Sequence, residues 1–457
     1  MSSSSSSSSS AEVEHLRSLP AIRERCARVF TLAQQGQLDY FDYVADNEAQ
    51  AVAYCQKIIE RDFGRNVASI PPHGRWRHFD AMGLPRVTTL LAQFHAQTPS
   101  VPPIEAARRL VDLFVVSVLL DAGAGPRWVY EELKTGLRIA RSEGLAVASL
   151  DMFENGVFAR NEEEGGDGVR EKCEAQALAR LTPELLSISL QVDPASNPMD
   201  GLEGRAGLLA RLGNVVSTDA HGYFAGPQAG IPGPAKRPGF LVDYLLGHAS
   251  TQKNATGQVQ VQVPVLWKAL IEGLAPVWPT EGRTVLDGVV MGDVWKCEAL
   301  EKHGGFQGQE ALVPFHKLTQ WLCYSIMEPM EQTLGWKFVG GEHQTGLPEY
   351  RNGGLLIDTG VLVPKPSVQA ASSAPVSALP TLTPSHPAVV EWRACTVILL
   401  DRIAAALRKS MGLADEDLNL KQVLEAATWK GGREIAREKR PETGGPPINI
   451  DSDGTIF

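Results

Sequence analysis

The sequence predicts a mainly α-helical protein. Three long segments carry apolar residues at the three- and four-residue spacing of an amphipathic helix, whereas only two short segments have the composition of strands. Apolar content is 43% and charged content 21%, values typical of a globular chain. The 457 residues suffice for one large or two ordinary domains with a substantial core.

Each of the three helical segments has its own signal. Residues 104–120 carry a long apolar face, and the second half of this segment is apolar all round, which predicts a central helix. In "FHKLTQWLCYSIMEP" (315–329), apolar residues again recur at three and four, and we expect Pro329 to end the helix. The pattern of residues 391–411 repeats this spacing and stops at Gly412.

Strand candidates are few, and three segments interrupt the helical pattern. We expect short strands in "GGLLIDTGVLV" (353–363) and in the terminal "INIDSDGTIF". A charged, glycine-rich segment covers 160–172, a proline-glycine loop covers 226–239, and a low-complexity segment rich in Pro, Ser and Ala covers 364–387. These segments interrupt one helical body rather than separate several domains.

The domain organisation follows from these segments. Residues 1–13 form a serine-rich tail that we expect to be disordered, and residues 14–363 form the helical body. Residues 364–387 are a linker or loop. Residues 388–457 are a C-terminal helical segment that we expect to pack back on the body.

Composition excludes several classes of protein. The net charge of −10 argues against a nucleic-acid partner, because phosphate contacts need a basic surface. No apolar run reaches the ~20 residues that span a bilayer, and the N-terminus lacks the apolar core of a secretory signal. Six scattered cysteines without a disulfide framework indicate a reducing compartment, so we expect a cytoplasmic protein.

Known chemical signatures are also missing from the sequence. The cysteines and histidines show no zinc-ligand spacing, and we expect neither a metal nor a cofactor. The sequence has no Walker phosphate loop, dinucleotide glycine fingerprint, GxSxG elbow or kinase motif set. Their absence argues against nucleotide hydrolysis, Rossmann redox chemistry and α/β-hydrolase chemistry. The sequence is silent on oligomeric state.

The first candidate site is "LLDAGAGPRWVYEE". Asp121 stands where the central helix gives way to small residues, and glycine there permits close approach of a ligand. If a helix restarts after this turn, Trp128 and Glu131 share one face and place an aromatic surface and a second carboxylate near Asp121. The alternative is structural: Asp121 caps the next helix and Trp128 lies in the core.

The second candidate is "GLPEYRNGG". Glu349, Tyr350, Arg351 and Asn352 are consecutive groups with polar or charged ends, followed by glycines, and loops dense in such groups often carry function. The alternative is a turn with a surface Glu–Arg pair.

The third candidate is the helix of "FHKLTQWL". Lys317, Gln320 and Tyr324 share a face, so Lys317 is a candidate for neutralising a phosphate and Gln320 for reading an amide. The alternative is a solvated stripe on an amphipathic helix.

The fourth candidate is "HGRWRHFD". Arg75, Arg77 and His78 surround Trp76 and Phe79, a combination that suits a sugar, a base or a phosphate. The alternative is a packed surface turn.

Eight stretches taken in order resemble the uracil catabolism protein 4 family, formerly a domain of unknown function: "RWRHFD", "DAGAGPRW", "NPMDGLEGR", "RPGFLVDYL", "FHKLTQWL", "GLPEYRNGG", "EWRACTVILLD" and "PPINIDSDGTIF". The resemblance implies a place in pyrimidine breakdown at the ribosylurea stage, where urea must be separated from the sugar. More distantly, "DAGAGPRW", "FHKLTQ" and "PEYRNGG" are similar to stretches of queuosine salvage N-glycosidases. That likeness implies a fold like the helix-hairpin-helix DNA glycosylases.

These resemblances imply a site. Glu349 and Asp121 match aspartates of the salvage family, and Lys317 and Gln320 match its helix. Cleavage of a ribosyl C–N bond passes through an oxocarbenium-like state that a carboxylate stabilises, while an acid or a hydrogen-bond donor helps the leaving nitrogen.

We therefore expect a hydrolase that converts ribosylurea or its 5-phosphate to urea and ribose or ribose phosphate. Glu349 and Asp121 are the predicted catalytic residues. The predicted substrate-binding residues are Trp128, Glu131, Lys317, Gln320, Tyr350, Arg351, Arg75 and His78. The partner would be this small ribosylated molecule, with no nucleic acid and no membrane. Two alternatives stay open: a metal-dependent amidohydrolase acting on another ring-opened intermediate, and a non-catalytic binding protein for a ribosylated intermediate.

Overall fold

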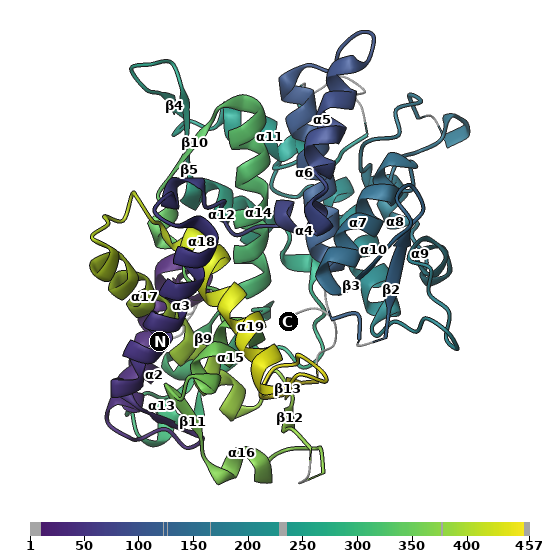
Figure 1. The fold of residues 1–457 in the computed structure, drawn as a ribbon. Coiled ribbons are helices and arrows are strands. Elements are labelled where there is room, and N and C mark those ends of the chain that lie inside the picture. Colours follow the sequence, from purple (N-terminus) through teal and green to yellow (C-terminus); the bar gives the residue numbers. More distant parts are fainter. Residues whose placement is uncertain are drawn as a thin grey trace, which may run out of the picture.

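The computed structural model confirms a mainly helical protein (Figure 1). It describes residues 11–121, 123–125, 127–164, 166–227, 235–375 and 378–451. The more specific helix-hairpin-helix glycosylase arrangement stays a prediction. No helix in the described ranges is both long and apolar enough to cross a membrane.

Eleven of the described helices are nine residues or longer. They are α2 (Leu19–Gln34), α3 (Glu48–Phe63), α5 (Arg86–Ala96), α6 (Pro103–Leu120), α7 (Arg141–Glu154), α10 (Leu202–Thr218), α12 (Val263–Gly273), α14 (Lys317–Leu334), α15 (Tyr350–Asp358), α17 (Pro387–Met411) and α19 (Trp429–Lys439). Shorter helices connect them: α4 (Trp76–Phe79), α8 (Ala175–Ala179), α9 (Pro183–Ser189), α11 (Leu241–Gly247), α13 (Glu298–Lys302), α16 (Pro366–Ala370) and α18 (Leu420–Val423).

Strands in the described ranges form only small sheets. Antiparallel pairs join β1 (Phe41–Tyr43) to β11 (Leu362–Pro364), β2 (Val129–Glu132) to β3 (Leu137–Ala140), β6 (Val285–Leu286) to β7 (Val289–Val290), and β8 (Val294–Lys296) to β9 (Leu312–Pro314). The three-stranded sheet has the order β10 (Lys337–Val339), β5 (Val259–Gln262), β4 (Gln252–Lys253), and β12 (Thr381–Leu382) runs parallel to β13 (Asn449–Ile450).

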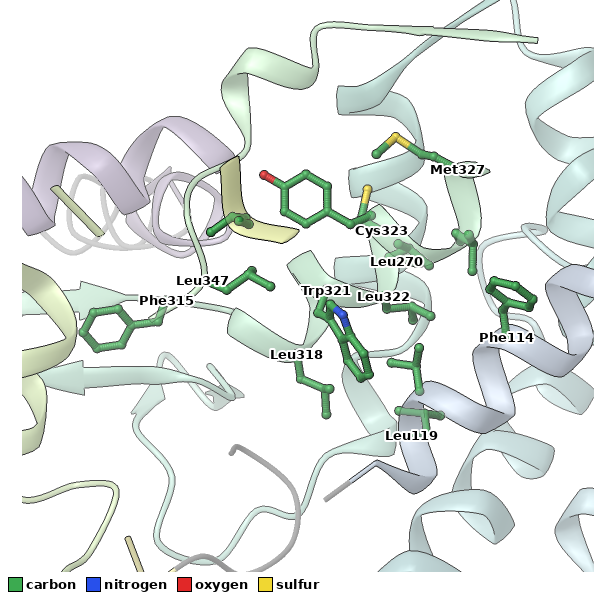
Figure 2. Close-up of a cluster of buried hydrophobic side chains, with 14 of the residues drawn as sticks. Phe114, Leu119, Leu270, Phe315, Leu318, Trp321, Leu322, Cys323, Met327 and Leu347 are labelled. Carbon is green, nitrogen blue, oxygen red and sulfur yellow. The ribbon is translucent and has the colours of Figure 1, made fainter. Parts of the chain in front are cut away.

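The core is built around two helices, α6 and α14, which pack along each other near the middle of the molecule (Figure 1). Every residue of α6 from Leu110 to Leu120 is buried, as is every residue of α14 from Leu318 to Met330. Figure 2 shows Leu318 and Trp321 of α14 close to Leu119 in the last turn of α6. The apolar, all-round character of both segments follows from this central position.

Two helix predictions are confirmed and one is wrong at its end. Helix α6 covers the predicted residues 104–120 and begins one residue earlier. Helix α17 ends as predicted at Gly412, whose φ of 69° provides the left-handed C-cap. Helix α14, however, continues through Pro329 to Leu334. Proline removes one backbone hydrogen bond, and the burial of apolar neighbours such as Met327 and Met330 compensates for that loss.

The predicted strand at 353–363 is also wrong, because most of it is helix α15. Its glycines are helical and allow close packing. A Cβ on Gly353 would lie 2.7 Å from the indole of Trp392, and a Cβ on Gly432 of α19 would lie 2.1 Å from the carbonyl oxygen of Arg351. Helices α15, α17 and α19 therefore meet at distances that only glycine permits.

The helix predicted to restart after the "AGAG" turn is replaced by the β2–β3 hairpin. Tyr130 pairs with Ile139, and both side chains are buried, whereas Glu131 points to the exposed side of the strand. Gly136 closes the hairpin turn with a φ of 70°. Because successive strand residues face opposite sides, Trp128 and Glu131 do not share a face.

The predicted tail, loops and C-terminal segment can be placed in part. Residues 11–16 are already helical, so ordered structure begins inside the predicted tail, whose first ten residues lie outside the described ranges. Residues 228–234 of the proline-glycine loop and 452–457 of the predicted terminal strand are also outside them. The segment 364–387 contains α16 and β12, and α17 packs against α2 and α3. All six cysteines lie in described ranges, buried and unpaired.

The close approach of α15 and α19 gives a stability prediction. Gly432→Ala should lower the free energy of unfolding by about 1–3 kcal/mol, because the new methyl group forces the helices apart. The matched control is Gly247→Ala, where no atom lies within 4 Å of the new methyl, and helix propensity should keep the change within about 1 kcal/mol in the stabilising direction. Urea unfolding measures both, and a Gly432→Ala protein as stable as the wild type would contradict the close contact.

Candidate active site

A buried ion pair lies at the centre of the candidate site. Arg75, which precedes α4, has no solvent exposure, and its Nη1 lies 2.9 Å from Oδ2 of Asp121 at the C-terminal end of α6. The Asp121 side chain is 8% exposed. A buried guanidinium is costly unless it is paired and hydrogen-bonded, so Asp121 has a structural role here.

Arg75 also connects three other helices. Its Nε donates to the hydroxyl of Ser117 on α6 (2.8 Å), which in turn accepts from Ser149 on α7 (2.6 Å). Its backbone N–H donates to the hydroxyl of Ser325 on α14 (3.1 Å). Its Nη2 is buried and has no hydrogen-bond partner among the described residues. Through its guanidinium and its backbone N–H, Arg75 therefore fixes the end of α6 relative to α4, α7 and α14.

His78 stands beside this pair as a neutral imidazole. Burial lowers the pKa of His78 well below its usual value, and the charge of Arg75 lowers it further. Since Arg75 Nη1 lies 3.1 Å from Nδ1 of His78 and can only donate, the ring proton sits on Nε2. The imidazole packs against the indoles of Trp321 and Trp429, with ring centroids 5.8 and 5.6 Å away. His78 thus presents one N–H donor between two aromatic surfaces.

Glu349 is the N-cap of α15. Its Oε2 accepts from the backbone N–H of Arg351 (2.7 Å) and its Oε1 from that of Asn352 (2.5 Å). The side chain is buried, which excludes the simple surface Glu–Arg pair considered from the sequence. Two backbone donors and the helix dipole fix the position of this carboxylate.

The charges of Asp121 and Glu349 both influence the pKa values of Lys317 and Tyr350. Burial lowers the pKa of Lys317, and the negative charges of Glu349 and Asp121 counter that shift. Burial raises the pKa of Tyr350, Arg351 opposes this, and Glu349 and Asp121 again raise it. Both carboxylates are therefore close enough to interact with one ammonium and one phenol. We call Asp121, Glu349, Lys317 and Tyr350 the carboxylate cluster.

The ammonium of Lys317 is the least engaged group of the carboxylate cluster. Its Nζ lies 5.9 Å from the ring centroid of Trp321, and it forms no hydrogen bond or ion pair with a described residue. Oδ1 of Asp121 likewise has no hydrogen bond within the described ranges, because its ion pair uses Oδ2. These two polar atoms therefore have no hydrogen-bond partner among the described residues.

An ion pair that the sequence analysis did not identify positions the other half of the cluster. Arg393 of α17 donates to both oxygens of Asp293 (2.7 and 2.8 Å) and to the carbonyl of Pro348 (3.1 Å), next to Glu349. Asp293 also accepts the backbone N–H of Lys317 (3.0 Å). Burial opposes ionisation of Asp293, but Arg393 holds its pKa well below the usual value. The sequence signal was a lone arginine inside the apolar run "EWRACTVILL".

Three of the predicted binding residues have side chains engaged elsewhere, and a fourth is exposed on the β2–β3 hairpin. The Gln320 amide is fully buried and bonds to Thr345 and to the carbonyl of Phe315. The buried indole of Trp128 donates to the carbonyl of Leu190. The guanidinium of Arg351 donates to the carbonyl of Gly444. Glu131 is exposed on the hairpin. Contacts of these four residues with a substrate stay predictions.

The described residues contain no group of three or more His, Cys, Asp or Glu side chains arranged to hold a metal ion. The carboxylate cluster has two carboxylates and also a lysine that feels both of their charges, and the nearby His78 already uses Nδ1 as an acceptor. This donor set suits a cationic or hydrogen-bonding ligand better than a divalent metal.

Comparison with known proteins places this chain in a family. A family model described as a protein of unknown function (DUF1688) matches residues 15–457. The chain belongs to this family. It is 40% identical over 458 residues to uracil catabolism protein 4 of Lachancea kluyveri, and 37% identical over 446 residues to protein urg3 of Schizosaccharomyces pombe. Each alignment covers 97% of this chain and 99% of the relative.

Four of the eight stretches that resemble the family also contain the residues of the candidate site. "RWRHFD" contributes Arg75 and His78, "DAGAGPRW" contributes Asp121, "FHKLTQWL" contributes Lys317, and "GLPEYRNGG" contributes Glu349 and Tyr350. These stretches are separated by long segments of chain, and α6, α14 and α15 bring them together.

Removing the carboxylate of Asp121 should destabilise the protein. Asp121→Asn leaves the buried Arg75 guanidinium unpaired and should lower the free energy of unfolding by about 3–5 kcal/mol. Asp46→Asn removes an exposed carboxylate and is the control, with an expected change within about 0.5 kcal/mol. The double replacement Arg75→Met with Asp121→Leu should recover part of the loss. A loss below about 1 kcal/mol in Asp121→Asn would contradict the buried pair.

His78 should make stability depend on acid pH. Because its pKa is depressed in the folded protein, only the unfolded chain takes up this proton as pH falls below about 6.5. The free energy of unfolding should then decrease by up to about 1.4 kcal/mol per pH unit from this residue. His78→Asn keeps an acceptor for Arg75 and should show a shallower slope between about pH 6.5 and 5. Identical slopes for both proteins would exclude a neutral His78.

Proposed function

We propose that this protein acts in uracil catabolism and hydrolyses the N-glycosidic bond of ribosylurea, or of its 5-phosphate, to urea and ribose or ribose phosphate. The name of the Lachancea relative, which aligns along nearly its whole length, supports the pathway. The convergence of Asp121 and Glu349 on Lys317 and Tyr350 supports the reaction.

The reaction has three requirements. The ribosyl carbon develops positive charge as the C1–N bond breaks, a water molecule must be activated to attack that carbon, and the departing urea nitrogen must receive a proton. Two carboxylates and one ammonium meet these requirements without a redox step. The carboxylate cluster draws these groups from the C-terminal end of α6 and from the N-terminal ends of α14 and α15.

The two carboxylates have different surroundings, which suggests different roles. Both oxygens of Glu349 accept backbone N–H groups, so this carboxylate is rigid and suited to stabilising the positive charge on the sugar. Asp121 keeps Oδ1 free of described partners and is suited to accepting a proton from the attacking water. Arg75 holds Asp121 in the orientation that this step requires.

Lys317 is suited to protonating the leaving urea. Burial lowers the pKa of its ammonium, which makes it a stronger acid, while Glu349 and Asp121 keep it charged before reaction. The proton moves from Nζ to the urea nitrogen as the C1–N bond breaks, and the water oxygen forms the new bond to C1. Asp121 then holds the proton lost by water, so the charges balance.

The first test is urea release by the purified, chelator-treated protein from synthetic ribosylurea and its 5-phosphate. Glu349→Gln should reduce kcat by at least about 100-fold, because the amide cannot stabilise the oxocarbenium-like state. The same change should cost only about 1 kcal/mol of stability, since one side-chain oxygen still caps α15. Glu416→Gln alters an exposed carboxylate and should leave kcat unchanged.

Three outcomes would contradict the proposal in different ways. Unchanged kcat in Glu349→Gln would remove this residue from the mechanism. Urea release that appears only after metal is restored would favour an amidohydrolase. Tight binding of both compounds by folded protein without any urea release would favour a binding protein.

A further inference from the structure

Three arginines from different helices converge on one turn beside the carboxylate cluster. Arg141 at the start of α7 donates to the carbonyl of Thr443 (3.0 Å), and Arg351 of α15 donates to the carbonyl of Gly444 (2.8 Å). Arg437 of α19 packs against the same turn, since a Cβ on Gly444 would lie 3.1 Å from its Cγ. We call Arg141, Arg351 and Arg437 the arginine group.

The arginine group has an excess of positive charge. None of the three guanidiniums forms an ion pair with a carboxylate in the described part of the chain. Two neighbouring arginines are paired: Arg433, one turn before Arg437 on α19, bonds to Glu143 (2.5 Å), and Arg440 pairs with Asp358. The positive charges of Arg351, Arg433 and Arg437 lower the pKa of Arg141, after burial. Such a concentration of unneutralised guanidiniums in a protein with a net charge of −10 suits an anion.

The start of helix α7 adds further donors to the same place. Arg141 is the first residue of this 14-residue helix and has a φ of 59°, a left-handed conformation that non-glycine residues adopt at a cost and that often marks functional sites. The preceding N-cap residue, Ala140, has no side chain with which to cap the first-turn amides, and the described residues supply no substitute. An anion at this position would meet both the guanidiniums and the positive end of the helix dipole.

Tyr350 connects the arginine group to the carboxylate cluster. The guanidinium carbon of Arg351 lies 5.0 Å from the Tyr350 ring centroid. Besides burial, the charges of Glu349 and Asp121 raise the pKa of Tyr350, and the charges of Arg351 and Arg141 lower it, so this phenol lies within the influence of both groups. A ribose bound against this ring would lie near both carboxylates and guanidiniums, the two kinds of group that a reacting C1 and a phosphorylated C5 require.

We propose that the arginine group binds the 5-phosphate of the substrate, so that ribosylurea 5-phosphate, rather than ribosylurea, is the molecule this protein acts on. The inference rests on the proposed function for the identity of the sugar. Arg141 and Arg437 are exposed and would contact the phosphate directly, whereas Arg351, which is buried, would contribute mainly its charge and its position beneath Tyr350. Arginine suits this role because its planar fork binds phosphate oxygens in pairs.

Binding and turnover test this inference separately. Ribose 5-phosphate and ribose are titrated into the full-length protein by calorimetry, and urea release is measured from both ribosylurea compounds. We expect ribose 5-phosphate to bind at least about 100-fold more tightly than ribose, since each charge-assisted contact contributes roughly tenfold. The value of kcat/KM should favour the phosphorylated compound by a similar factor.

The double variant Arg141→Gln with Arg437→Gln isolates the arginine group. Both side chains are exposed, so the protein should keep its thermal midpoint. Affinity for ribose 5-phosphate and kcat/KM for the phosphorylated compound should fall by about 100-fold, while kcat/KM for ribosylurea should change by less than about twofold. Arg138→Gln removes one exposed arginine three residues before Arg141 and should change none of these values.

The outcomes separate this inference from the proposed reaction. Urea release at equal kcat/KM from both compounds, or an unchanged double variant, would overturn the arginine group as a phosphate site while leaving the hydrolase intact. Arginine-dependent binding of ribose 5-phosphate without urea release would support the phosphate site and contradict the hydrolase. Ribose 5-phosphate binding no tighter than that of ribose would likewise overturn the phosphate site.

Discussion

The buried ion pair between Arg75 and Asp121 is the constraint on which the rest of the site depends. A guanidinium with no solvent exposure requires a carboxylate, and the end of α6 supplies it. The other hydrogen bonds of Arg75, to Ser117 and Ser325, tie α4, α6 and α14 into one arrangement. This arrangement brings Lys317, at the start of α14, close enough to Asp121 for the negative charge of Asp121 to oppose the lowering of the lysine pKa by burial. Stability and candidate chemistry are thus carried by the same carboxylate.

The opposite wall of the site depends on close packing rather than on a single charge pair. Gly353 and Gly432 allow α17 and α19 to approach α15, and this approach carries Glu349 and Arg351 into the interior. Arg393 then fixes the loop before Glu349 through Pro348 and, through Asp293, the first residue of α14. A second buried ion pair therefore sets the spacing between Glu349 and the lysine. The glycines of this region serve helix packing, not loop flexibility.

Charge is distributed unevenly across the site, which has one region rich in carboxylates and another rich in arginines. Carboxylates and one lysine stand at the ends of α6, α14 and α15, whereas arginines without a described carboxylate partner gather at the turn of residues 443–444, and the charges of both groups shift the pKa of Tyr350. A molecule that carries developing positive charge at one end and a fixed negative charge at the other fits this distribution. The overall acidity of the chain gives no hint of this local basic region, because net charge averages over the whole surface.

The sequence by itself determined the helical class, the central helices and the residue types of the site. Helical periodicity is a local property, and α6 and α17 could be read from it. It failed where tertiary contacts override local preference: Pro329 inside α14, the glycines of α15 and the hairpin after Asp121. Only the tertiary structure decided which polar groups meet. In the folded protein Gln320 bonds to Thr345 and to the carbonyl of Phe315, Lys317 lies within the influence of two carboxylates, and the arginine group comes from three helices. Such meetings depend on how distant helices pack, and no short stretch of sequence encodes them.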